Sequence, residues 1–201
     1  MQNLKSLSNH TTHDLGAEAP VVWRQALWLA LLVGASVAFS LGFACAAPLA
    51  AFGALAAMTL SQRDALLLTG AVWLANQLVG FASLDYPWTG STFAWGIALG
   101  IVTALATVAA RAMATRVDGR GAAVVSLAAF ISAFIVYEGG IFVVAATLLG
   151  GTEDFAPAIV ARILEINAAA FAGLLVLNRL GMTVGRAARP AARLSTMEGH
   201  T

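Results

Sequence analysis

The residues of this 201-residue chain that could do chemistry are a few polar side chains set within long apolar segments. Ionisable and amide groups are costly in hydrocarbon, so they usually face a bundle interior or a cavity and mark a pathway or a site. Asn76 and Gln77 stand in one apolar segment, and Glu138 and Glu165 stand in two later ones. Such groups offer polar contacts to a bound molecule, or an acid–base pair.

The amide pair belongs to a face with an aromatic neighbour. Trp73, Asn76, Gln77 and Gly80 share one side of a helix, because residues three and four positions apart lie together. At a rise of 1.5 Å per residue, the amides lie about 18 Å above the start of their segment. They either contact a ligand or link helices through hydrogen bonds worth about 1 kcal/mol each.

A second concentration of aromatic residues follows in the stretch "DYPWTGSTFAW", residues 85–95. Tyr86 and Trp88 fit the ordinary role of aromatic anchors at the membrane surface. Trp88, Thr92 and Trp95, however, fall on one face where the next helix begins. Flat rings with a few convergent polar groups are typical of a pocket for a planar or heterocyclic small molecule.

The charged residues at depth lie in the last two apolar segments. Arg162 and Glu165 are spaced i, i+3, so they can form an ion pair or supply a second polar contact to a ligand. Glu138 has no basic neighbour in its own segment, and Arg162, protonation or a ligand's positive group could neutralise it. We therefore predict a substrate-binding site made of Trp73, Asn76, Gln77, Trp88, Thr92, Trp95, Glu138, Arg162 and Glu165.

Other kinds of site are disfavoured. All three histidines, His10, His13 and His200, lie in the terminal tails, so neither a bis-histidine haem nor a histidine metal site is expected among the helices. The chain has no phosphate-binding glycine loop and no acidic metal cluster. We expect no catalytic residues, no cofactor and no metal. Cys45 permits no internal disulfide and fits a small packing residue.

Composition indicates a membrane protein with no separate soluble domain. Hydrophobic residues make up 60% of the chain and charged residues 10%, against roughly a quarter in soluble domains. The apolar runs predict an all-α bundle of six transmembrane helices. The second is short and contains Pro48, which leaves room for a re-entrant or tilted segment. The six predicted helices are 21–42, 45–60, 65–84, 91–113, 122–150 and 157–180.

The basic residues predict the orientation, because short cytoplasmic loops accumulate Lys and Arg. With the N-terminus inside, only Arg162 of the eleven basic residues does not fall on the cytoplasmic side. We expect a multi-pass protein of a bacterial-type inner (plasma) membrane, with cytoplasmic tails at 1–20 and 181–201 flanking a transmembrane domain at 21–180. The net charge of +1 argues against a nucleic-acid partner.

The first predicted helix carries a small residue at every fourth position, namely Ala30, Gly34, Ala38 and Gly42. Such a strip lets another helix approach closely, either within the bundle or from a separate subunit. With its six helices, cytoplasmic ends and polar groups towards the outer face, the chain resembles the substrate-binding S components of energy-coupling factor (ECF) vitamin transporters. That resemblance implies docking through Ala30, Gly34 and Ala38 onto a transmembrane coupling subunit that carries the ATPases.

The sequence therefore favours a non-enzymatic membrane transport protein that takes a small ring-containing nutrient from the outer face. Its partners are expected to be the lipid bilayer, the substrate and separate energising subunits. One alternative is a membrane subunit or assembly partner of a larger complex with no ligand of its own. An enzyme acting on a lipid or quinone, with Glu138 and Glu165 as its acid–base pair, stays open as a third.

Overall fold

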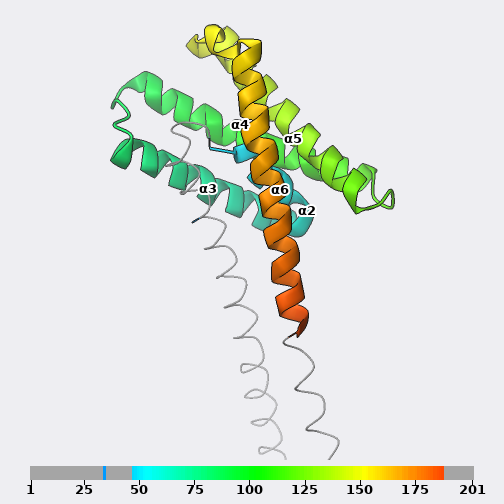
Figure 1. Cartoon of the computed structure of the whole chain (residues 1–201). Coiled ribbons are helices and arrows are strands. Elements are labelled where there is room, and N and C mark those ends of the chain that lie inside the picture. The colour runs from blue at the N-terminus through cyan, green and yellow to red at the C-terminus, as the bar shows by residue number, and fades with distance from the viewer. Residues whose placement is uncertain (1–33, 35–46, 188–201) are drawn as a thin grey trace, which may run out of the picture.

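A computed structural model describes Gly34 and residues 47–187 of the chain (Figure 1). The first predicted helix, 21–42, lies outside these residues except for Gly34, which is helical. Every regular element in the described part is a helix. In chain order they are α2 (Leu49–Thr59), α3 (Gln62–Ser83), α4 (Gly90–Arg116), α5 (Ala122–Val144), the π-helix η1 (Ala145–Leu149), the 3₁₀ helix η2 (Thr152–Phe155) and α6 (Pro157–Ala187).

Four of these helical stretches are long and apolar enough to cross a membrane: α3, α4, α5 continued by η1, and α6 up to Leu180. Only 22% to 33% of the residues in their most apolar windows are buried within the protein, so most of the apolar surface faces outwards. Exposed residues such as Leu67, Ile101 and Ile135 would be unfavourable in water and are favourable in lipid. The prediction of a multi-pass helical membrane protein therefore agrees with the structure.

The second predicted helix, 45–60, is shorter in the structure. α2 spans eleven residues, or about 16 Å, which is about half of a bilayer's hydrocarbon core. Pro48 occupies the N-cap position directly before the helix, and Leu60 leaves the helix in an extended conformation. The sequence left room for a re-entrant or tilted segment here, and the observed helix is too short to cross the hydrocarbon core by itself.

α2 forms the centre of the described bundle. It contacts α3, α4, α5 and α6, and its residues from Leu49 to Ala57 are all buried. A helix that is apolar on every side suits such a position. Small residues allow this close packing. A Cβ added to Gly53 would lie only 2.9 Å from the hydroxyl oxygen of Thr107 in α4.

The long helices begin at side-chain caps. The Ser61 hydroxyl accepts from the backbone N–H of Asp64, and Thr89 caps α4 by accepting from the N–H of Thr92. These caps place the starts of α3 and α4 at Gln62 and Gly90, slightly earlier than the hydrophobic runs predict. The helices α4 and α6 also run past the predicted 113 and 180.

The connection from α5 to α6 is compact. The π-helix η1 widens the last turn of α5, and Gly150 and Gly151 both adopt positive φ, at 78° and 93°. Glycine adopts positive φ without steric cost. This turn folds η2 back over the end of α5, and α6 then begins at Pro157. α6 then crosses the other helices (Figure 1).

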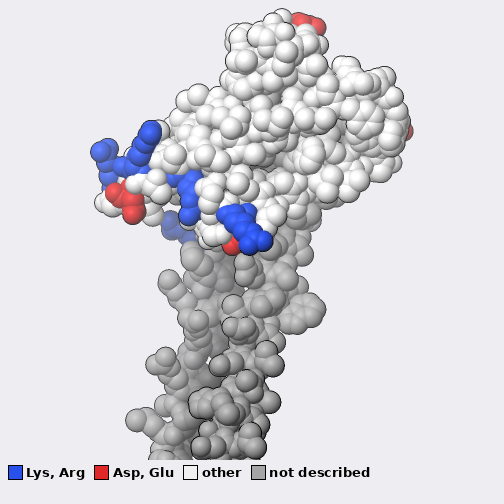
Figure 2. Space-filling view, turned by 180° about the vertical axis from the view of Figure 1, so that it is seen from behind, with Lys and Arg blue, Asp and Glu red and all other residues white. Residues whose placement is uncertain are grey.

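Arginine side chains gather at one end of the described protein, which we call the basic end (Figure 2). It comprises the start of α3, the last turns of α4, the α4–α5 connection and the last turns of α6. The remaining described surface in Figure 2 is almost entirely uncharged. The residues that define the basic end are Arg63, Arg111, Arg116, Arg120 and Arg179.

Candidate ligand-binding cavity

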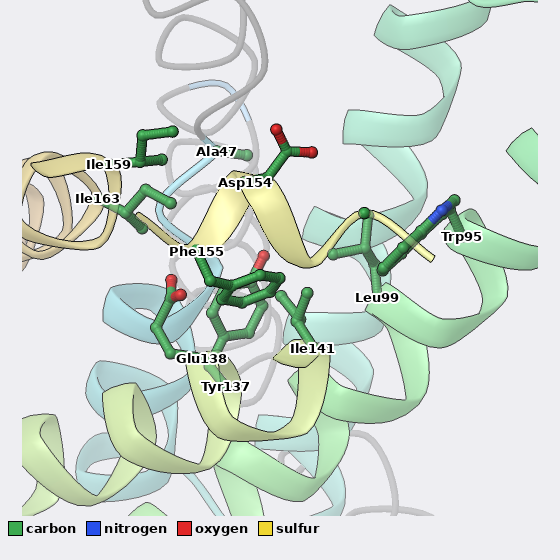
Figure 3. A pocket seen from close by; sticks show the side chains of 11 residues that line it. Ala47, Trp95, Leu99, Tyr137, Glu138, Ile141, Asp154, Phe155, Ile159 and Ile163 are labelled. Atoms are coloured by element: carbon green, nitrogen blue, oxygen red, sulfur yellow. The ribbon is translucent and has the colours of Figure 1, made fainter. Parts of the chain in front are cut away.

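A cavity of about 480 Å³ lies at the end of the bundle opposite the basic end. It is enclosed by α4, α5, η2 and α6, together with Ala47 just before α2 (Figure 3). Its volume is within the range typical of small-molecule sites. The lining consists of Ala47, Trp95, Leu99, Tyr137, Glu138, Ile141, Gly151, Asp154, Phe155, Ile159 and Ile163.

Two consecutive residues of α5 give this largely apolar cavity its polar groups. The Tyr137 side chain is only 7% exposed, and within the described part of the chain its hydroxyl makes no hydrogen bond. The Glu138 carboxylate is half-buried and likewise has no partner among the described residues. Both side chains extend from α5 towards η2 in Figure 3. Buried polar groups normally have partners, so these two groups are the ones most available to a ligand.

The 3₁₀ helix η2 covers the cavity. Phe155 lies over Tyr137 and Ile141, and its ring meets that of Phe142 edge to face with centroids 5.2 Å apart (Figure 3). The Asp154 carboxylate points away from Glu138, on the other side of η2. The cover therefore presents an aromatic face to the interior and an acidic group at the rim.

Of the nine predicted site residues, the structure brings Trp95 and Glu138 to this cavity. Trp95 lies on the α4 wall beyond Leu99, across the cavity from Glu138 (Figure 3). The two residues are 43 positions apart in the sequence. The structure therefore places one predicted aromatic residue and one predicted polar residue in the lining of the same cavity.

Trp73 and Gln77 lie instead at the contact between α3 and α4. The indole Nε1 of Trp73 donates to the backbone carbonyl of Gly96 at 2.8 Å, and the Gln77 side chain packs closely against the same glycine. Gly100 allows the Trp73 ring to approach. The Gly96 and Gly100 pair therefore serves packing within the bundle. Asn76 is half-buried on α3 and does not line the cavity.

Trp88 and Thr92 lie outside the cavity as well. Trp88 is 75% exposed and contacts Phe81 and Phe93, with ring centroids 4.9 Å and 5.9 Å away. Thr92 shares a hydroxyl–hydroxyl hydrogen bond with Thr89 at the start of α4. This placement matches an aromatic anchor at the membrane surface and a helix cap.

Arg162 and Glu165 are both exposed on α6, and neither forms an ion pair within the described residues. The face of α6 that meets the cavity carries Ile159 and Ile163. Of the predicted docking residues, Ala30 and Ala38 lie outside the described part. Gly34 is exposed, with no heavy atom within 4 Å of the position where a Cβ would be.

Sequence reasoning missed Tyr137, Asp154 and Phe155 as cavity residues. Tyr137 precedes Glu138 directly, but adjacent helical residues point about 100° apart, so the position of Glu138 gives no signal for Tyr137. Asp154 and Phe155 belong to a loop that the sequence placed outside the membrane without any signal that it folds over α5. No group of three or more metal-ligating side chains is found in the described part of the chain.

Two structural polar residues were also missed. Asn167 is 1% exposed, and its side-chain oxygen accepts from the backbone N–H of Ala51 at 3.2 Å. Arg111 donates to the carbonyls of Ala57 and Leu60, at 3.2 Å and 2.6 Å. The two side chains therefore satisfy backbone groups at both ends of the buried helix α2.

Comparison with known proteins adds no relative. No family model matches the chain, and neither a curated protein nor a solved structure matches it.

Proposed function

We propose that this chain is a membrane transport protein that binds a small ring-containing nutrient in the cavity beneath η2. The observation that carries the proposal is the Tyr137 hydroxyl and Glu138 carboxylate in a largely apolar, aromatic-lined cavity, where neither forms a hydrogen bond or an ion pair with a described residue. An apolar chamber with a few polar groups is the usual form of a small-molecule site.

The basic end supports an orientation with both termini in the cytoplasm of a bacterial-type inner membrane. The cavity then opens towards the outer face, as capture of an external nutrient requires. The chain offers no nucleotide-binding motif, so energy for uptake comes from separate subunits. This arrangement is the one implied by the resemblance to ECF S components, with Ala30, Gly34 and Ala38 as the docking face.

Mass spectrometry of gently purified protein tests the proposal. Wild-type protein is expected to release a small molecule on denaturation, and Ile141→Trp, which fills the cavity, is expected to lose it. Ile135→Trp is the matched control, because Ile135 lies on the same helix but is 62% exposed. An occupant that survives Ile141→Trp, or no occupant in any preparation, would contradict a ligand site in this cavity.

A second candidate function is that of a structural subunit in a larger membrane complex. It is favoured by Arg162 and Glu165, which are exposed on α6 although charged groups are costly in contact with lipid. A partner helix would cover them. This function predicts that Glu165→Gln and Ala30→Leu weaken co-purification of a partner, whereas Glu138→Gln has no effect. The first candidate predicts that Glu138→Gln impairs uptake.

A further inference from the structure

We infer that the ligand of the cavity is a small organic cation, held by the Glu138 carboxylate and the surrounding aromatic rings. The inference rests on the proposed function, since it names the class of substrate for the same site. It is drawn from the charges, partners and ring positions of the cavity lining.

The described residues that line the cavity include acidic side chains but no basic one. Glu138 lies inside and Asp154 lies at the rim, while the eleven lining residues include no lysine, arginine or histidine. A ligand with a negative charge would meet only repulsion there. A ligand with a positive charge gains attraction at the rim and again at the interior carboxylate.

Glu138 also lacks a counter-charge among the residues that the structure describes. Within the described residues it makes neither an ion pair nor a hydrogen bond, and its surroundings in the cavity are Tyr137, Phe155 and Ile163. A carboxylate in apolar surroundings is stabilised by pairing with an opposite charge. Arg162 is the nearest base along α6, but it is exposed and is not part of the lining. On this inference, the bound molecule supplies the positive charge that neutralises Glu138.

The rings indicate an organic cation. Tyr137, Phe155 and Trp95 supply π faces to the cavity, and cations with apolar substituents bind such faces well. A strongly hydrated metal ion would need several oxygen ligands, and no cluster of metal-ligating residues is found in the part of the chain that the structure describes. The Tyr137 hydroxyl adds one hydrogen-bonding group, which accepts from an N–H or donates to an acceptor on the same ligand.

Titration calorimetry with three matched probes tests the inference. The probes are benzyltrimethylammonium, its neutral isostere neopentylbenzene and the anion benzenesulfonate, each added to purified protein freed of native ligand. Ile141→Trp protein corrects for partition into detergent. The cation is expected to bind wild-type protein saturably, and at least about ten times more tightly than either other probe, because desolvated cation–π contacts and attraction to the carboxylate contribute about that much.

Single substitutions test which side chains bind the cation. Glu138→Gln is expected to weaken binding of the cation about ten-fold or more, and Tyr137→Phe to weaken binding less. Glu165→Gln is the matched control, since it removes the same charge from an exposed position on α6 and leaves the cavity unchanged. Arg162→Gln is expected to leave cation binding unchanged because Arg162 does not line the cavity.

The outcomes distinguish this inference from the proposed function. Equal binding of the neutral isostere, or undiminished cation binding by Glu138→Gln, would overturn the organic cation while leaving the ligand site intact. Failure of the cation to bind saturably would also overturn the inference. Mass spectrometry of the gently purified protein then decides separately whether the cavity binds any ligand. Increased cation binding in Arg162→Gln would show that Arg162 is the native partner of Glu138.

Discussion

Asn167 connects the start of the buried helix α2 to α6. Its side-chain oxygen accepts from Ala51 N–H, and its amide nitrogen donates to the carbonyl of Ile163 at 3.0 Å. Ala51 is in the first turn of α2, where N–H groups have no partner within the helix. Pro48 at the N-cap has no side chain that could accept from them. Asn167 therefore takes the part of an N-cap residue, from a helix 116 positions away in sequence.

Replacing Asn167 by leucine is predicted to destabilise the protein by about 1–3 kcal/mol, because a buried N–H loses its acceptor. Unfolding followed by circular dichroism in a detergent titration measures this difference. Asn178→Leu is the control, since Asn178 lies on the same helix, is half-buried and makes no hydrogen bond in the described part of the chain. Equal stability of the two variants would show that the bond to Ala51 contributes little.

The sequence could predict which residues are chemically unusual, but it could not predict which of them meet. Depth along a helix follows from counting, so the sequence can suggest which residues of different helices lie at the same end. The rotation of each helix about its own axis depends on its neighbours. Trp73 and Gln77 therefore looked equally suited to a ligand, although they pack against Gly96.

At the scale of elements, the contact between α4 and α5 depends on the absence of a side chain at one position. A Cβ on Gly140 would lie 2.9 Å and 3.1 Å from the two methyl carbons of Val102, which is itself buried. The side chain of valine is stiff at χ1 and cannot swing aside. Gly139, one position earlier in α5, has nothing within 4 Å of the same point.

Alanine at these two neighbouring glycines is predicted to have opposite effects. Gly140→Ala forces α4 and α5 apart and is expected to lower the free energy of unfolding by about 1–3 kcal/mol. Gly139→Ala is expected to be neutral or slightly stabilising, because alanine favours a helix more than glycine does. The same detergent titration compares them. A loss of stability with Gly139→Ala as large as that with Gly140→Ala would contradict the packing described for α5.

The helices themselves were largely predictable, because apolar runs and their polar punctuation fix where a chain can cross a membrane. The exceptions have physical causes. α2 starts late because Pro48 precedes it, and the α5–α6 connection is ordered by Gly150 and Gly151 at positive φ. The fold of that connection over α5 could not be predicted, since it depends on the contact of Phe155 with Phe142.

At the scale of the whole molecule, the asymmetry of charge sets the expected orientation. In a Cys45→Ala background, Glu153→Cys in η2 is predicted to react with a membrane-impermeant maleimide on intact cells. Asp118→Cys, in the α4–α5 connection at the basic end, is predicted to react only after the membrane is permeabilised. The reverse labelling pattern would place the cavity on the cytoplasmic side and exclude capture from outside.

The central claim is that the cavity beneath η2 holds a ligand against Glu138 and Tyr137. An experimental density map of protein purified without removal of native small molecules tests it most directly. The expected result is non-protein density in the cavity, with an atom within hydrogen-bond distance of the Glu138 carboxylate or the Tyr137 hydroxyl. A cavity closed by repacked side chains, or filled only by a lipid acyl chain, would contradict the account.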